Sequence, residues 1–118
     1  MIRPLALIFA LFALPAAAQQ ATNADGGEIR VLDKTTGVVS DLAFMAGETK
    51  RYGLLEITME ECRFPSGNPS GDAFVLLTVF YRDLPDPAFR GWMIASAPAL
   101  NAMDHPRYDV WALRCNTP

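Results

Sequence analysis

The sequence predicts a small, mainly β domain: an antiparallel barrel or sandwich with one short helix near the C-terminus. Three observations lead to this prediction. Short apolar and β-branched runs recur along the chain, Gly- and Pro-rich stretches interrupt them, and residues 96–106 alone favour a helix. We expect one domain over residues 28–118, after a cleaved signal peptide (1–18) and a flexible leader (19–27).

The N-terminal residues have the pattern of a secretory signal peptide. Arg3 supplies a positive charge, the ten residues 5–14 are apolar, and three alanines after Pro15 offer small residues to a signal peptidase. Ten apolar residues are too few to span ~30 Å of hydrocarbon, which takes about 20 residues in a helix. No cysteine follows directly to carry a lipid. We therefore predict cleavage after about Ala18 and a periplasmic location.

Charge and cysteine content limit the function classes. The chain has 10 basic and 13 acidic residues, and the loss of Arg3 with the signal makes it more acidic. Because no basic cluster could neutralise phosphates, neither nucleic acid nor an anionic membrane surface is an expected partner. In an exported chain, Cys62 and Cys115 predict one disulfide rather than a redox pair, since their spacing is far from Cys-x-x-Cys. Closing a loop of roughly 54 residues contributes about 4 kcal/mol in the chain-entropy treatment.

The first half of the domain is predicted as strands separated by turns. Strands are expected at 28–33 and 38–44, turns at 33–37 and 45–49, and either a strand pair or one bent strand over 50–62. Within the last of these, alternation places Leu55, Ile57, Met59 and Glu61 on one face and Glu56, Thr58, Glu60 and Cys62 on the other. This alternation is typical of a half-buried strand.

The second half begins with an exposed Gly- and Pro-rich loop at 63–72. The expected elements after it are a strand buried on both faces at 73–81, a turn at 82–87, a strand at 88–96, a helix of at most two turns within 96–106, and a closing strand at 107–115. Gly91 indicates a bulge or a close backbone approach in its strand. In the closing strand, Trp111, Leu113 and Cys115 share one face, and Tyr108, Val110, Ala112 and Arg114 share the other.

Ser96, His105 and Asp109 supply the residue types of a hydrolytic triad. The context does not favour one, because Ser96 lacks a Gly-x-Ser-x-Gly turn. A metal site is not expected either, since His105 with Asp104 or Asp109 gives two ligands where a closed zinc site takes four. We expect His105 to be structural, held at the Pro106 turn by a hydrogen bond to backbone or to a carboxylate such as Asp109.

Two tryptophans leave a choice open. Trp92 and Trp111 either fill the core or, in one case, stay partly exposed as a contact anchor, a role for which tryptophan is favoured. Glu60 and Glu61 are neighbours on a strand and therefore point to opposite faces. They are predicted to be solvated charges rather than a paired acid and base.

Residues 91–115, GWMIASAPALNAMDHPRYDVWALRC, resemble the C-terminal signature of domain-of-unknown-function family 2155. The stretches LDKTTGVV and GETKRYG and the residue Cys62 are also similar to that family, so the resemblance covers nearly the whole domain. Ala97 and Asp104 depart from it, where Ser and Glu are expected. The matching residues are Gly91, Trp92, Met93, Ala95, Ser96, Pro98, Ala99, Leu100, His105, Pro106, Tyr108, Asp109, Val110, Trp111 and Cys115.

The resemblance implies a short exported alphaproteobacterial protein with no assigned activity, often encoded beside an accessory subunit of respiratory complex I. We expect a periplasmic, non-catalytic binding or assembly module with an envelope or membrane-complex protein as partner, and with neither cofactor nor metal. The alternatives are a small hydrolase using Ser96 and His105, and an accessory protein on the periplasmic side of a respiratory complex. The candidate contact face consists of Trp92, Met93, Ser96, Pro98, His105, Tyr108, Asp109 and Trp111.

Overall fold

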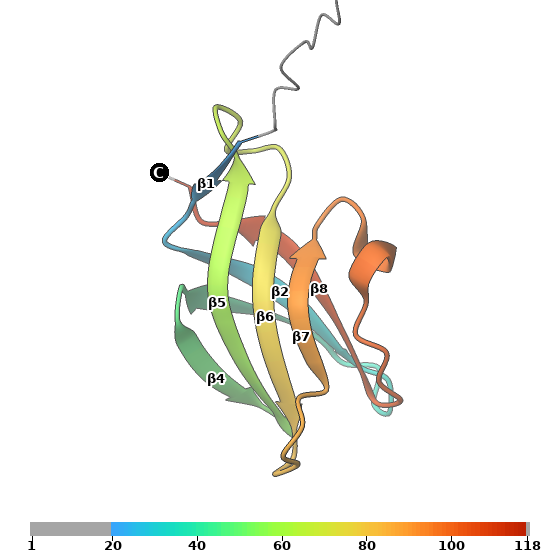
Figure 1. Cartoon of the computed structure of the whole chain (residues 1–118). Coiled ribbons are helices and arrows are strands. Elements are labelled where there is room, and N and C mark those ends of the chain that lie inside the picture. Colours follow the sequence, from blue (N-terminus) through green and yellow to red (C-terminus); the bar gives the residue numbers. More distant parts are fainter. Residues whose placement is uncertain (1–19, 118) are drawn as a thin grey trace, which may run out of the picture.

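Runs of alternating apolar and polar residues form eight strands, which build two antiparallel sheets packed face to face (Figure 1). This computed structural model describes residues 20–117. The predicted mainly β fold is confirmed, as an open sandwich rather than a closed barrel. The elements are β1 (Ala21–Asn23), β2 (Gly26–Asp33), β3 (Val39–Met45), β4 (Glu48–Tyr52), β5 (Leu55–Pro65), β6 (Phe74–Tyr81), β7 (Phe89–Ile94), the 3₁₀ helix η1 (Pro98–Asn101) and β8 (Tyr108–Cys115).

The larger sheet, sheet A, has five strands arranged around β5. One edge of β5 pairs with β6, which pairs in turn with β7, and the other edge binds β4 and then β1. The smaller sheet, sheet B, has the order β3-β2-β8. The buried residues between the two sheets include Ile29, Val31, Phe44, Leu55, Ile57, Met59, Val75, Leu77, Val79 and Tyr108.

A β-bulge in β5 changes which side chains face the core. The register with β6 shifts between Met59 and Glu61, so one residue of β5 is extra. Beyond the shift, Cys62 lies on the same side of the sheet as Met59 and is 1% exposed, while Glu61 is turned outward. The prediction that Glu61 shares the face of Met59 is therefore wrong, because strict alternation does not survive a bulge.

A second β-bulge, in β8, also changes which side chains face the core. Leu113 has no partner in β2, since Ala112 and Arg114 pair with consecutive residues of that strand. Cys115 consequently turns to the core instead of sharing an outward face with Leu113, as alternation had predicted. The structure links Cys62 of sheet A and Cys115 of sheet B by a disulfide, with 5.7 Å between their Cα atoms.

The ordered domain starts earlier in the chain than predicted. Ala21–Asn23 forms β1, which pairs with the end of β5, and β2 follows directly. All side chains of β1 are exposed, so it is held by backbone pairing and by a hydrogen bond of 2.8 Å between the hydroxyls of Thr22 and Ser66. The structure thus differs from the flexible leader predicted over 19–27. The predicted signal peptide, 1–18, lies outside the described residues.

Three other segments refine the predicted elements. Over residues 50–62 the structure contains the strand pair, β4 and β5, rather than one bent strand. β5 continues to Pro65, so the predicted loop over 63–72 begins only after that residue. Of the strand expected at 73–81, the inner face is buried, while the outward side chains are half-buried like Phe74, except Thr78, which is 4% exposed. Among the residues that the structure describes, no helix has both the length and the apolar character needed to span a bilayer.

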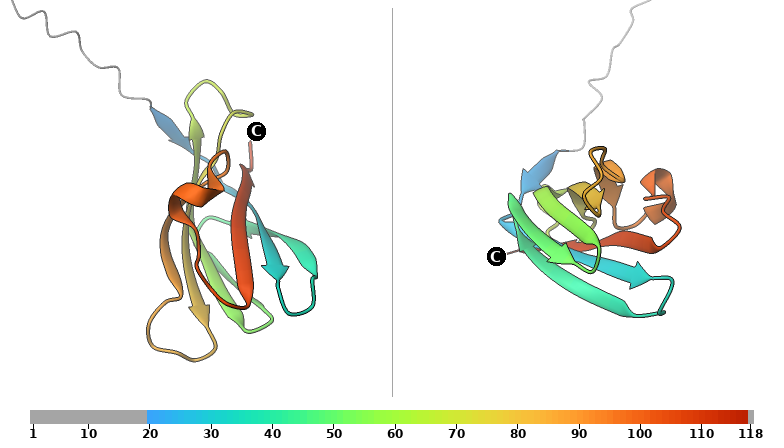
Figure 2. Two further views of the ribbon diagram at one scale, coloured as in Figure 1. Left: turned by 90° about the vertical axis from the view of Figure 1, so that its right-hand side faces the viewer. Right: turned by 90° about the horizontal axis from the view of Figure 1, so that it is seen from below.

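Residues 95–107 connect β7 to β8 across one side of the sandwich, where β7 and β8 are the edge strands of their sheets (Figures 1 and 2). This segment contains η1 and is anchored by Met103, which is 3% exposed. Asn101 Nδ2 donates to the carbonyl of Trp92 at 2.8 Å. The same nitrogen lies 2.9 Å from where a Cβ of Gly91 would stand, so this glycine permits a close approach and not a bulge.

Candidate contact surface

The three residues of the possible hydrolytic triad, Ser96, His105 and Asp109, bind other groups and not one another. Ser96 donates its hydroxyl proton to Asp72 Oδ2 at 2.5 Å, and the backbone N–H of Ser96 binds the second oxygen of the same carboxylate at 3.0 Å. Asp109 forms an ion pair with Lys34 at 3.0 Å. His105 binds neither Ser96 nor Asp109. The structure therefore does not assemble the nucleophile, base and orienting acid that a triad requires.

His105 fixes the entry to β8. Its Nδ1 accepts hydrogen bonds from the backbone N–H groups of Arg107 at 3.1 Å and Tyr108 at 3.2 Å, and its ring lies 4.4 Å from the ring of Tyr81. Burial lowers the pKa of His105, and the positive charge of Lys34 lowers that pKa further. A neutral imidazole with its proton on Nε2 matches this arrangement, since Nδ1 faces two donors. The hydrogen bonds go to backbone, which is one of the two partners that the sequence predicts.

Metal-ligating side chains do not gather within residues 20–117. In that range, no three His, Cys, Asp or Glu side chains lie close enough to bind one ion. The disulfide also removes both cysteines from the set of available ligands.

The eight residues of the predicted contact face do not share one surface. Met93 and Tyr108 belong to the core, at 3% and 1% exposure. Ser96 and Pro98 are exposed at the beginning of the 95–107 segment, and His105 lies near its end. Trp92 projects from the outer face of sheet A, whereas Asp109 and Trp111 belong to the outer face of sheet B. Of the two roles left open for the tryptophans, neither indole fills the core, and both are partly exposed.

A groove surrounds Trp92 on the outer face of sheet A. Arg63, Phe74 and Ile94 lie side by side on β5, β6 and β7, and with Ala21 and Trp92 they line a volume of about 240 Å³. The Arg63 guanidinium lies 5.0 Å from the centre of the indole ring, which is cation–π range. We call this surface the Trp92 groove. It combines an aromatic anchor, apolar walls and one cation, which is the composition of a protein-binding surface.

Sequence reasoning missed Phe74 and Ile94 as members of this surface. Both belong to apolar strands and were therefore assigned to the core or to no site. A signal was present, because residues 73–81 carry apolar side chains on both faces while sheet B covers only one of them. The other face of such a strand must meet solvent or a partner.

A second groove lies beside Trp111, between β8 and η1. Its volume is also about 240 Å³, and it is lined by Pro98, Ala99, Ala102, Met103, Asp109, Val110 and Trp111. Trp111 pairs across sheet B with Arg30, whose guanidinium binds both carboxylate oxygens of Asp41. An ion pair between Arg114 and Glu28 flanks this row. The outer face of sheet B therefore carries ion pairs beside its groove, together with exposed apolar side chains such as Val39 and Met45.

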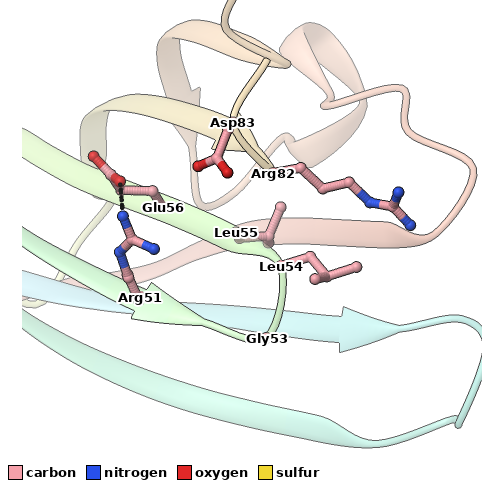
Figure 3. A pocket seen from close by; sticks show the side chains of 7 residues that line it. All are labelled: Arg51, Gly53, Leu54, Leu55, Glu56, Arg82 and Asp83. Atoms are coloured by element: carbon pink, nitrogen blue, oxygen red, sulfur yellow. Dashed lines mark hydrogen bonds and ion pairs between the residues drawn. The ribbon is translucent and has the colours of Figure 1, made fainter.

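A third pocket, about 380 Å³, lies at the end of the sandwich near the β4–β5 turn (Figure 3). Arg51 and Glu56 form an ion pair of 3.2 Å at its rim, and Arg82 points away from them (Figure 3). Arg51 is 78% exposed, so this ion pair is open to solvent and adds little stability. The pocket brings no nucleophile or acid–base pair together with an apolar wall, and we assign it no chemistry.

Comparison with known proteins gives a family and no activity. A family model described as "Uncharacterized protein conserved in bacteria (DUF2155)" matches residues 27–115. An uncharacterized protein of Rickettsia prowazekii (strain Madrid E) is 31% identical over 96 residues, which are 79% of this chain. The chain spans 62% of the length of that relative. No solved structure matches.

Proposed function

Because the chain belongs to the bacterial family of uncharacterized proteins DUF2155, whose description names no activity, we propose a function from its geometry. The protein is a non-catalytic binding module of the cell envelope, and it uses the Trp92 groove to hold an envelope or membrane-complex protein. The observation that carries this proposal is the partly exposed indole of Trp92 among apolar side chains on the face of sheet A that sheet B does not cover.

The location follows from the N-terminal sequence and the cysteines. The apolar segment before Pro15 is typical of a secretory signal, and an inter-sheet disulfide suits an oxidising compartment such as the periplasm. N-terminal sequencing of the protein from a periplasmic extract tests this part. A mature chain beginning at about Gln19 is expected, and a chain retaining residues 1–18 in the cytoplasm contradicts it.

Trp92 is a better anchor than Trp111 for a stable partner. Residues most important for binding are aromatic or Arg side chains in apolar pockets that become fully desolvated on contact. Trp92 has Phe74 and Ile94 beside it, and Arg63 on its ring. A partner at Trp111 would have to desolvate two neighbouring ion pairs, Arg30 with Asp41 and Arg114 with Glu28, which costs free energy. The Trp92 groove contains one such pair, Arg63 with Glu61.

Affinity capture from the envelope of the source bacterium tests the contact surface. The exported parent, Trp92→Ala and Trp111→Ala are tagged and compared after their folding has been checked by thermal unfolding. We expect one stable partner to be captured by the parent and by Trp111→Ala but lost by Trp92→Ala, since truncating a central anchor costs about 2 kcal/mol or more.

Ser96→Ala, run in parallel, separates the binding module from a hydrolase. It removes the hydroxyl bonded to Asp72 and leaves the Trp92 groove intact. Unchanged capture together with an unchanged cellular phenotype is the result expected of a binding module. A partner that Trp92→Ala still retains, or a phenotype that only Ser96→Ala removes, is incompatible with the proposal.

A further inference from the structure

β7 ends sheet A, and part of its backbone faces no other strand. Ala95 donates its N–H to the carbonyl of Ala73 in the β6–β7 ladder. Because antiparallel bonding alternates, the backbone groups of Arg90, Trp92 and Ile94 point to the opposite, free edge.

Of these six edge groups, two are occupied and four are not. Ala97 donates to the carbonyl of Ile94, and Asn101 donates to the carbonyl of Trp92. Residues 20–117 supply no partner for the N–H groups of Trp92 and Ile94 or for the N–H and carbonyl of Arg90. A strand edge with free donors and acceptors is a template for another extended chain.

The side chains at this edge belong to the Trp92 groove. Trp92 and Ile94 line it, and Arg90 lies on the same outer face one side-chain repeat from Trp92. In the described part of the chain, Arg82 and Arg90 are the basic residues without an ion pair, whereas Arg63 is paired with Glu61. The groove thus presents an exposed, uncompensated cation beside its apolar wall.

The free backbone groups and the unpaired Arg90 together indicate what kind of molecule binds at this edge. Free N–H and carbonyl groups fit an extended peptide backbone, and a lipid surface would leave them unsatisfied. A second copy of β7 would also supply backbone, but Arg90 is its one charged residue, so pairing two copies would place both arginines on one sheet face without an acid. A partner with an acidic residue avoids this repulsion.

We infer that β7 is a strand-addition site for an extended segment of the partner. That segment places an acidic side chain opposite Arg90 and an apolar side chain, two residues away, in the Trp92 groove. The inference rests on the proposed function and adds to it the conformation and the charge of the partner's segment.

Two eight-residue peptides that alternate Val and Thr are the probes, one with a central Glu and the other with a central Lys. They are titrated into the mature Trp111→Phe protein, in which Trp92 is the remaining indole, and amide exchange is followed by NMR. We expect the Glu peptide to shift Trp92 fluorescence and to slow exchange at the amides of Arg90 and Trp92. The Lys peptide should bind at least tenfold more weakly.

Charge reversal supplies the control. Arg90→Glu should reverse the preference between the two peptides, and Arg82→Glu, the same change at the other arginine without an ion pair, should not. Equal affinities, no binding, protection outside β7, or protection caused by dimerisation of the free protein would each overturn the inference. If the envelope partner buries Trp92 while both amides keep their exchange rates, strand addition is wrong and the proposed contact surface remains.

Discussion

At the scale of single residues, His105 has a structural role, although histidine near serine and aspartate is common in catalytic sites. A lone histidine near a serine and an aspartate suggests catalysis, yet the imidazole is used to close a chain reversal before β8. Its Nδ1 accepts from two successive backbone donors, those of Arg107 and Tyr108, while its carbonyl accepts from Lys34 Nζ at 2.9 Å. These two N–H groups do not bond to a neighbouring strand, so the imidazole Nδ1 supplies the hydrogen-bond acceptor that they would otherwise lack.

Replacing His105 is expected to lower stability without abolishing folding. His105→Ala removes the acceptor and the contact with Tyr81, which should cost roughly 1–3 kcal/mol and lower Tm by several degrees. His105→Asn should recover part of this loss, since its side-chain oxygen can accept from the same donors. Thermal unfolding of the three oxidised proteins measures the effect. If both variants melt like the parent while partner capture is lost, His105 is a binding residue and the structural role is wrong.

The same residue makes stability depend on pH in a defined direction. The folded-state pKa of His105 lies below its usual value of 6.5, because burial and Lys34 disfavour the charged form. Its contribution is therefore complete above about pH 6.5 and decreases as pH falls through 6.5 toward the folded pKa. Urea unfolding at pH 7.5 and pH 5.5 should show a loss in the parent that His105→Asn does not show. An equal loss in both proteins would assign the effect to other groups.

At the scale of elements, the bulge in β5 decides whether the two sheets can be joined. If residues 59–62 formed a regular strand without the bulge, strict alternation would point Cys62 away from sheet B, because Met59 and Cys62 are three positions apart. Deleting Glu60 and Glu61 together makes Cys62 the neighbour of Met59, so Cys62 should point away from sheet B and both cysteines should stay reduced, as mass spectrometry after alkylation without reductant would detect. Deleting Glu60 alone removes the extra residue, leaves Met59, Glu61 and Cys62 in regular alternation, and should keep the disulfide. Deleting Ser70 from the exposed loop after β5 is the matched control and should keep the disulfide. A disulfide between Cys62 and Cys115 in the double deletion, or its loss in the Glu60 deletion, would falsify this dependence on alternation.

Strands could be predicted from the sequence where apolar and polar residues alternate. They could not be predicted where backbone pairing, and not the burial of apolar side chains, holds the strand. β2, β3 and β8 follow from their side-chain pattern. β1 does not, because three exposed residues are held by backbone pairing. Bulges look in sequence like faulty alternation, so the faces of Cys62 and Cys115 were assigned wrongly. The position of Trp92 depends on which face of sheet A is covered by sheet B, which no local pattern encodes.

At the scale of the whole molecule, the two outer faces of the sandwich have become different surfaces. Sheet B carries ion pairs such as Arg114 with Glu28 among exposed apolar side chains such as Met45, whereas part of sheet A carries the Trp92 groove and the unpaired cation of Arg90. The core lies between the sheets and is the same for both. The difference that supports assigning the contact surface to sheet A is the unpaired Arg90 beside the Trp92 groove.

The disulfide links the two sheets covalently, and its removal should lower the stability of the whole domain. Cys62 and Cys115 are 53 residues apart in sequence, so the bond restricts a long loop of the unfolded chain. The chain-entropy treatment gives a contribution of about 4 kcal/mol, a large part of the stability of a small domain. Cys62→Ala with Cys115→Ala should therefore lower the free energy of urea unfolding by about that amount and expose the edge of β7 to faster amide exchange. The parent in reductant should match the double variant, because both lack the bond. A double variant as stable as the oxidised parent would mean that the packing of the sheets alone holds the sandwich together.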